Sequence, residues 1–403
     1  MDHSLPSRRQ SLTLITVLGV LTAASSLATD IYLPALPTLT RDFAVDPSYA
    51  QYSLSLFFIG LAAGQLVYGP IADRYGRKPV LFFGFTLYLL ASVACALADS
   101  MTMIIVARAI QGLGAATGQV IPRAIVRDRF SGSQAASVIS FVVMVMAAAP
   151  LIAPLIGSLI LTLGSWHGIF WLLCSYAVIS LVAIGGLLSE SLPPSRRIRD
   201  RSLLAQYLGY FTLLKRGPFR FYLTCGALMF GVLFTFVSAS SFVYIKEFGV
   251  DTSLFGFYFS FNMIAMLLGN LINGRLVVHF GYLRMLGVAV CNTLLWTLAL
   301  LATTLTGFGG LWGVVIPVFL LLLTVSMAGA NTVAGLLDLA PETAGAASAL
   351  FGVCQFTCGA LATTLVGLLG GDAVAMAIVM LIAVSGALMA FIGLRRYVLT
   401  PNT

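Results

Sequence analysis

The stretch Leu27-Ala28-Thr29-Asp30-Ile31-Tyr32-Leu33-Pro34-Ala35-Leu36-Pro37 closes an apolar run that begins near Leu12. The run is long enough to cross a membrane as a helix, and its prolines mark the expected exit. Asp30 lies inside the run, about two turns before that exit. A carboxylate at this depth costs roughly 2.5–3.5 kcal/mol on insertion scales, so it indicates a functional site.

The composition of the chain extends this interpretation to its whole length. Of 403 residues, 59% are hydrophobic and only 9% are charged, whereas soluble domains carry about 25% charged residues. Apolar runs of about 20 residues recur throughout, each sufficient to span a membrane. The sequence therefore predicts an all-α polytopic membrane protein with twelve transmembrane helices, near 12–36, 50–71, 79–98, 101–124, 134–162, 166–188, 219–245, 253–276, 282–304, 308–334, 343–369 and 373–396.

The longest hydrophilic stretch divides the chain into two predicted six-helix halves, 1–188 and 219–403. The linker 189–218 contains apolar residues at helical spacing flanked by bases such as Arg199 and Arg201, which predicts an amphipathic helix on the membrane surface. Gly69–Gly76 follows the second span and is echoed by Gly274–Gly281 after the eighth. Two related halves are typical of transporters that rock around a central site.

The distribution of basic residues predicts the orientation. The net charge of +8 is spread over short loops on one side, while the opposite loops hold only Arg41 and Lys246. Because Lys and Arg are enriched in cytoplasmic loops, both termini are expected in the cytoplasm. The same scatter argues against a nucleic-acid-binding patch.

Asp30 and Arg108 are predicted to lie at similar depth, since each is about seven residues from the outer end of its helix. No other acid or base lies as deep. Burial disfavours a charged carboxylate and a nearby guanidinium favours it, so the pair is expected to exchange protons. The alternative is a static ion pair that joins the first and fourth helices.

Other polar and aromatic residues inside the spans are candidates for contacts with a bulky amphipathic substrate, because apolar walls with few polar groups bind broadly. Helix packing is the competing explanation for each. The predicted cavity residues are Tyr32, Gln111, Phe234, Phe236, Tyr258, Asn262 and Asn331, with Gln119, Asn270, Gln355, Phe57, Phe58 and Phe261 as further candidates.

Enzyme chemistry is disfavoured. The sequence has no Walker loop, metal-ligand cluster, nucleophile motif or dinucleotide fingerprint. The six cysteines lie inside apolar runs without disulfide or CxxC spacing, so we expect buried thiols. No metal and no cofactor is predicted, and protons are the expected coupling ion.

Four segments of the chain resemble the major facilitator superfamily, and more closely its drug:proton antiporters of the bicyclomycin/chloramphenicol-resistance type. They are the loop Gly69–Pro79, the fourth-helix segment Arg108–Ala115, the fifth-helix segment Pro150–Gly157 and the first-helix segment Ala28–Pro37. The chain departs from the family pattern at Ala149 and Ala153, where antiporter motifs usually place glycine. It also lacks the second first-helix acid of some relatives, having Thr22-Ala23 there.

This resemblance implies roles for two groups of residues. Gly69, Asp73, Arg74, Gly76 and Arg77 would form a cytoplasmic gate, in which Arg77 or Arg74 pairs with Asp128. Asp73 could instead cap a helix, its own partner or the one beginning near Thr343. A charge cluster that only fixes topology is the alternative. The prolines Pro150 and Pro154, with Gly157 a turn further, would form a kink that seals the outer side, or an ordinary proline kink.

The function implied is a proton-coupled multidrug exporter of the bacterial inner membrane that works by alternating access. Its partners would be small-molecule drugs, protons and the lipid bilayer, and it would be monomeric. A proton-coupled importer of a metabolite is the first alternative, and a non-transporting sensor or scaffold the second. The latter is disfavoured because the chain has no sizeable soluble domain to relay a signal.

Overall fold

The computed structural model describes residues 8–197 and 203–399, so Arg199, Arg201 and the chain ends lie outside the described residues. Within them, twelve helices are long and apolar enough to span a membrane, and there is no strand. The predicted all-α, twelve-span fold class is confirmed. The spans are Leu12–Asp42, Pro47–Tyr75, Arg77–Ala96, Met101–Arg129, Ser137–Leu163, His167–Gly186, Gly217–Glu247, Thr252–Phe280, Tyr282–Thr306, Trp312–Leu339, Pro341–Leu368 and Ala373–Tyr397.

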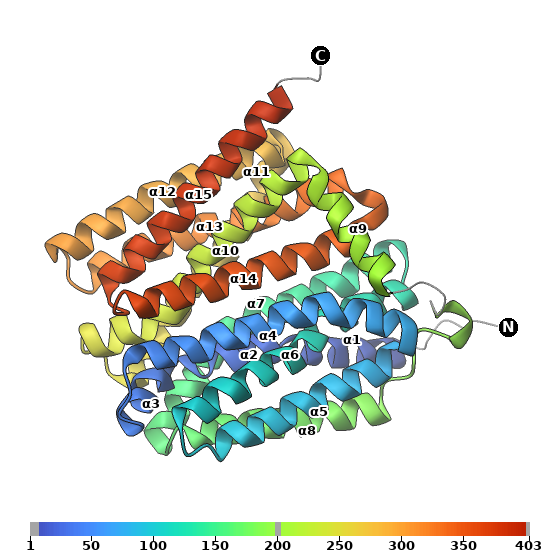
Figure 1. The fold of residues 1–403 in the computed structure, drawn as a ribbon, viewed down its shortest axis with the longest axis horizontal. Coiled ribbons are helices and arrows are strands. Elements are labelled where there is room, and N and C mark those ends of the chain that lie inside the picture. The colour runs from blue at the N-terminus through green and yellow to red at the C-terminus, as the bar shows by residue number, and fades with distance from the viewer. Residues whose placement is uncertain (1–7, 198–202, 400–403) are drawn as a thin grey trace.

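The helices gather into two bundles. In Figure 1 the first bundle occupies the lower part of the view and the second the upper part, with α9 beside them at the right. The first contains α1 (Arg8–Thr22), α2 (Ala24–Asp30), η1 (Leu33–Ala35), α3 (Leu36–Asp42), α4 (Pro47–Tyr75), α5 (Arg77–Ala96), α6 (Met101–Arg129), α7 (Gly132–Leu163) and α8 (His167–Gly186). The linker holds η2 (Pro194–Arg196) and α9 (Leu203–Lys215). The second bundle contains α10 (Gly217–Ser241), the π-helical η3 (Phe242–Glu247), α11 (Thr252–Phe280), α12 (Tyr282–Thr306), α13 (Trp312–Leu339), η4 (Pro341–Thr343), α14 (Ala344–Leu368) and α15 (Ala373–Leu399).

Two faces of the molecule are used below. The linker face carries the turn at Gly76, helix α9 and the segment that follows α8. The distal face is the opposite one and carries the start of α4 and the end of α14. The turn at Gly76 between α4 and α5 has φ 107°, and Gly281 repeats it between α11 and α12 with φ 76°. Both values favour glycine, which explains the echo between the two halves of the sequence.

The first span is longer than predicted. Its expected exit at Pro37 was wrong, because Pro37 sits in the first turn of α3, which continues to Asp42. A proline at that place needs no backbone N–H partner, so it starts a helical segment rather than ending the span. The helix instead breaks after Asp30, where α2 ends, and the 3₁₀ segment η1, which contains Pro34, begins at Leu33.

Glycines allow the helices of the first bundle to touch through their backbones. A Cβ at Gly60 would lie 2.1 Å from the Ala109 carbonyl oxygen, and one at Gly112 would lie 2.1 Å from that of Phe57. Helices in a bilayer associate largely through close packing at small residues, because lipid tails are as apolar as the helices and give little hydrophobic driving force for association. This contact fixes α6, and with it Arg108, against α4.

Hydrogen bonds at the distal face join α4 to the second bundle. The Gln51 amide donates to the Ser238 carbonyl at 2.9 Å, and the Ser55 hydroxyl donates to that of Ala360 at 2.9 Å. The hydroxyls of Ser55 and Thr364 lie 2.8 Å apart. All these groups lie within a few turns of the distal helix ends.

A second set of distal bonds joins α7 to α11. The Gly256 N–H donates to the Ser158 hydroxyl at 3.2 Å, and the Ser260 hydroxyl donates to the Leu151 carbonyl at 2.6 Å. Across residues 8–197 and 203–399, the hydrogen bonds and ion pairs between the bundles that the structure gives all lie on this side. The molecule is therefore closed at its distal face.

Candidate functional site: a cavity lined by a buried carboxylate

A cavity of about 320 Å³ lies between the two bundles, on the linker side of the distal hydrogen bonds. Its walls are mostly apolar and include four phenylalanines and three methionines. Polar groups come from the first, fourth, eighth and eleventh spans. The lining residues are Ser25, Ser26, Thr29, Asp30, Phe58, Leu61, Gln119, Arg123, Val143, Met146, Ala147, Pro150, Phe230, Leu233, Phe234, Val237, Met263, Met266, Leu267, Asn270, Gln355 and Phe356.

Asp30 is the acid in this lining. It is the last residue of α2, where the helix breaks, and only 5% of its surface is exposed. The break is held by α7, since a Cβ at Gly157 would lie 2.2 Å from the Ile31 carbonyl oxygen and 3.0 Å from the ring of Pro34. Gly157 of the predicted kink thus supports the residues that follow Asp30.

Arg108 does not form the predicted ion pair with Asp30 among the described residues. Its Nη1 donates to the Ala28 carbonyl at 2.9 Å and to the Gln111 side-chain oxygen at 2.6 Å. The guanidinium carbon lies 4.6 Å from the ring centre of Tyr32 and 4.1 Å from that of Phe57. Cation–π contact and neutral acceptors therefore stabilise this fully buried charge.

This arrangement corrects the expected proximity of the two charges. The depth argument itself holds, because the Arg108 guanidinium bonds the Ala28 carbonyl and lies over the Tyr32 ring, on either side of Asp30 along the chain. Residues 28 and 30, however, point to different sides of a helix. Arg108 holds the backbone beside Asp30 instead of its carboxylate, and its Nε and Nη2 have no hydrogen-bond partner in the part of the chain described.

A chain of amides lies on the linker side of Asp30 and ends at Ser25. The Gln65 amide donates to the Gln119 oxygen at 2.8 Å, and the Gln119 amide donates to the Ser25 hydroxyl at 2.5 Å. Gln119 was a further candidate in the sequence, as were Asn270 and Gln355, and all three line the cavity. Arg123 also lines it. The sequence pattern assigned Arg123 to a loop because it lies near the end of its apolar run.

Of the seven predicted cavity residues, only Phe234 lines this cavity. The other six pack elsewhere, because the face that each helix turns toward the cavity depends on its neighbours and not on hydropathy. Tyr32 bonds Ser53 beneath Arg108, and Gln111 bonds Ser92. The remaining four lie inside the second bundle: Phe236 stacks on Phe259, Tyr258 lies against Trp312, Asn262 donates to Tyr244, and Asn331 pairs with Asn273.

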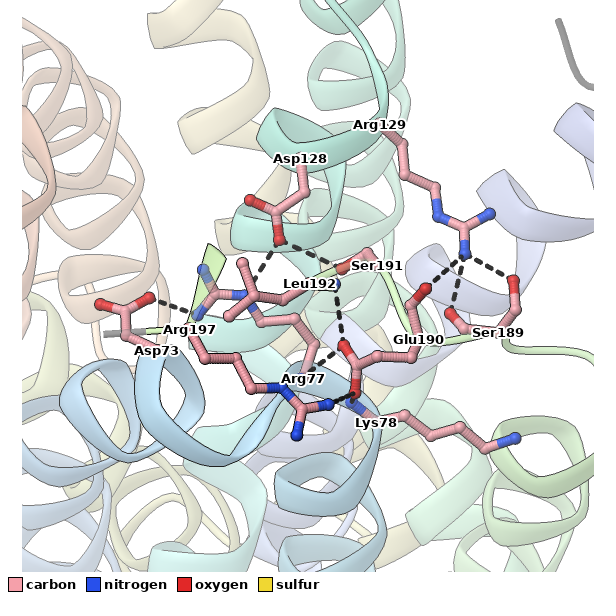
Figure 2. Close-up of polar contacts among 10 residues, drawn as sticks. All are labelled: Asp73, Arg77, Lys78, Asp128, Arg129, Ser189, Glu190, Ser191, Leu192 and Arg197. Carbon is pink, nitrogen blue, oxygen red and sulfur yellow. Dashed lines mark hydrogen bonds and ion pairs between the residues drawn. The ribbon is translucent and has the colours of Figure 1, made fainter. Parts of the chain in front are cut away.

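The predicted gate on the linker face is an ion-pair cluster within the first bundle (Figure 2). Arg77 pairs with Asp73 at 2.7 Å and with Asp128 at 3.0 Å, so Arg77 makes the pair with Asp128 that the resemblance implies. Arg74 instead lies over the ring of Tyr75. The Asp73 carboxylate binds the Arg77 side chain and not a helix N-terminus.

The N-terminus of α5 is capped by a residue that sequence reasoning missed. Glu190 accepts from the backbone N–H groups of Arg77 at 2.9 Å and Lys78 at 3.2 Å, although it lies more than a hundred positions away. A Cβ at Gly76 would lie 2.5 Å from the same carboxylate, so glycine is required there for space as well as for its φ. At Gly69, by contrast, a Cβ would meet nothing within 4 Å, so glycine is not required there for space.

Replacing Glu190 with alanine is expected to lower stability by about 1 kcal/mol, the usual effect of losing a helix cap. The backbone donors of Arg77 and Lys78 would lose their acceptor. The melting temperature in detergent measures this, with Glu342→Ala, an exposed acid in η4, as the control. Equal melting temperatures for the two variants would show that the cap contributes nothing.

Pro150 and Pro154 lie inside the continuous helix α7. Pro150 lines the cavity, while a Cβ at Gly256 would lie 2.9 Å from the Pro154 carbonyl oxygen. The predicted kink region thus contacts the cavity, the broken first helix and the second bundle. Its role as a seal of the outer side stays a prediction.

Two bundles of apolar helices around a central cavity have the architecture of a membrane transporter and not of an enzyme. The chain belongs to the Major Facilitator Superfamily, whose sequence profile matches residues 18–364. It is 33% identical over 393 residues to the uncharacterized MFS-type transporter YdgK of Bacillus subtilis, covering 97% of each chain.

Two further relatives carry names that refer to drugs. The bicyclomycin resistance protein homolog of Haemophilus influenzae is 31% identical, covering 90% of each chain, and multidrug resistance protein D of Escherichia coli is 28% identical, covering 86% of each. Among solved structures, the xylose transporter XylE of Escherichia coli matches with a TM-score of 0.75 at 13% identity, covering 97% of this chain and 99% of that one. The last match shows the shared fold alone.

Proposed function

We propose that this chain is a proton-coupled multidrug exporter of the bacterial inner membrane. The observation that carries the proposal is Asp30, a buried carboxylate that lines an apolar cavity between the two bundles. A group that gains and loses a proton inside the substrate site can couple proton movement to drug movement, because the proton and the drug then use the same site. The names of the Haemophilus and Escherichia relatives support drugs as the substrates.

The proposed orientation places the linker face and both termini in the cytoplasm. It rests on the basic residues, which gather in the loops of that face, as is usual for cytoplasmic loops. The closed distal face then corresponds to an inward-facing state with its cavity available from the cytoplasm or the inner leaflet. We expect a monomer.

The proposed cycle has two steps at Asp30. In the inward-facing state the deprotonated carboxylate accepts a substrate in the cavity. After the distal face opens, a proton from outside neutralises Asp30 and substrate leaves. The carrier then returns to the inward-facing state, where Asp30 releases the proton to the cytoplasm. One charge moving through 100 mV supplies about 2.3 kcal/mol, which sustains a roughly 50-fold gradient of a neutral drug.

Import of a small polar metabolite is the main alternative. Such a substrate needs several hydrogen-bond partners, whereas most of this cavity is lined by phenylalanine, methionine and aliphatic side chains. The solved sugar transporter shares only the fold at 13% identity. The cavity therefore favours amphipathic compounds over sugars.

A drug-susceptibility panel on a strain that overexpresses the protein tests the proposal. We expect raised tolerance to several amphipathic compounds. In energised everted vesicles, adding such a compound should release protons from the lumen. Raised tolerance without any proton movement would refute the coupling, and greater sensitivity or unchanged tolerance across the panel would refute export.

A further inference from the structure

Arg123 is a cation in the cavity for which the described structure provides no carboxylate. It lies in α6, six positions before that helix ends, and belongs to the cavity lining with an exposed side chain. The contact given for its guanidinium is with the sulfur of Met146 at 4.0 Å. Charged side chains within membrane spans normally pair or face a functional site.

Three other arginines of the described chain have acceptors or rings around them. Arg77 lies between two carboxylates, and Arg108 is held by a carbonyl, an amide and two rings. Arg129 donates to the Ser189 hydroxyl and backbone. Arg123 differs from these three because it lines a cavity of about 320 Å³.

Arg123 and Asp30 both line the cavity and lie at different levels along the helix axes. The bond between Gln119 and Ser25 places these two residues at one level. From there α2 runs five residues toward the distal face to reach Asp30, and α6 runs four residues toward the linker face to reach Arg123. At 1.5 Å per residue the two charged residues are about 13 Å apart along the helix axes.

We infer that Arg123 is a specificity-determining residue that binds an acidic group of the substrate. Together with Asp30 it forms a bipolar site for elongated zwitterionic amphiphiles, with the acidic end on Arg123 and the amine toward Asp30. Methionines 146, 263 and 266 line the wall between them, and their flexible side chains suit varied ring systems. This inference rests on the proposed export function and names its substrate class.

The bipolar site also connects binding to the proposed cycle. Protonation of Asp30 removes the partner of the substrate amine, while Arg123 keeps its charge at all physiological pH values. Proton binding thus weakens one end of the site and leaves the other unchanged. A permanently cationic compound lacks the acidic end and meets the charge of Arg123 without compensation.

Two probes test the assignment: norfloxacin as a zwitterion and tetraphenylphosphonium as a permanent cation. Binding of each to purified protein is measured for the unmodified chain, Arg123→Gln, Arg123→Lys and Arg127→Gln. Arg127 lies one turn further along α6 and outside the cavity lining. We expect the unmodified chain to prefer norfloxacin, and Arg123→Gln to weaken norfloxacin binding by about tenfold or more, as loss of a charged hydrogen bond does.

The lysine variant should keep the preference for norfloxacin because it keeps the charge, and Arg127→Gln should leave it unchanged. An unaltered preference in Arg123→Gln, or a preference of the unmodified chain for the cation, would overturn the assignment. So would a failure of the unmodified chain to bind norfloxacin. The susceptibility panel tests export separately, so these results refute the substrate class without refuting drug efflux.

Discussion

Asp30→Asn is expected to abolish proton-driven export while the protein still reaches the membrane in normal amount. Asparagine has nearly the same shape, so the end of α2 and its packing against Gly157 should persist. An amide does not take up or release a proton at physiological pH, however, and Asp30 is the carboxylate in the cavity lining. Drug-stimulated proton release from everted vesicles should fall to the level of vesicles without the transporter.

The control for this variant is Asp99→Asn, which removes an exposed acid from the turn before α6 and should leave proton release unchanged. Asp30→Glu should retain part of the activity, because the carboxylate remains but its position shifts by one methylene. Uphill export by Asp30→Asn at the unmodified rate would show that coupling occurs at another group. Loss of the protein from the membrane would mean that Asp30 acts in folding.

Features set by local chemistry were predictable from the sequence. The twelve spans follow from apolar length alone, since a bilayer demands about twenty residues per helix. The pair between Arg77 and Asp128 was expected from the resemblance of the Gly69–Pro79 loop to the superfamily, with Arg74 as the alternative partner. The turn at Gly76 follows from the need for a residue that accepts positive φ.

Features set by packing were not predictable. Hydropathy identifies a membrane helix but not the face turned toward the cavity, so Phe236 and Asn262 were expected in a site that they do not line. Arg108 was expected opposite Asp30 because the two lie at similar depth, but depth does not tell which face of the first helix Arg108 meets. Glu190 caps α5 from a distant segment, and no local pattern marks that contact.

Arg123 was missed for a different reason. The enrichment of basic residues in cytoplasmic loops was applied to all the arginines near the end of the fourth span, including Arg123. Basic residues near helix ends usually lie on the cytoplasmic side, and Arg127 and Arg129 lie in the last turn of the helix. Arg123 lies inside the predicted fourth span, 101–124, and it lines the cavity. The missing signal was the face of the helix on which Arg123 lies.

A disulfide between Ser55→Cys and Thr364→Cys is expected to stop transport, and reduction is expected to restore it. The two hydroxyls are 2.8 Å apart across the distal face, one on α4 and one on α14. Cysteines there would lie close to the separation that a disulfide spans. The bond would hold the bundles together where the proposed cycle requires them to separate, so the protein would stay in the state described by the structure.

The experiment uses a chain whose six native cysteines are replaced, since Cys354 and Cys358 share α14 with Thr364. Thr293→Cys with Thr324→Cys is the matched control: those hydroxyls are 2.7 Å apart but join α12 to α13 within one bundle. Oxidation of the control pair should leave drug efflux intact, because that contact has no reason to open. Mass spectrometry verifies that each bond has formed. If the fully oxidised distal pair exported drug at the rate of its reduced form, the distal face would not open during transport, and alternating access between these bundles would be wrong.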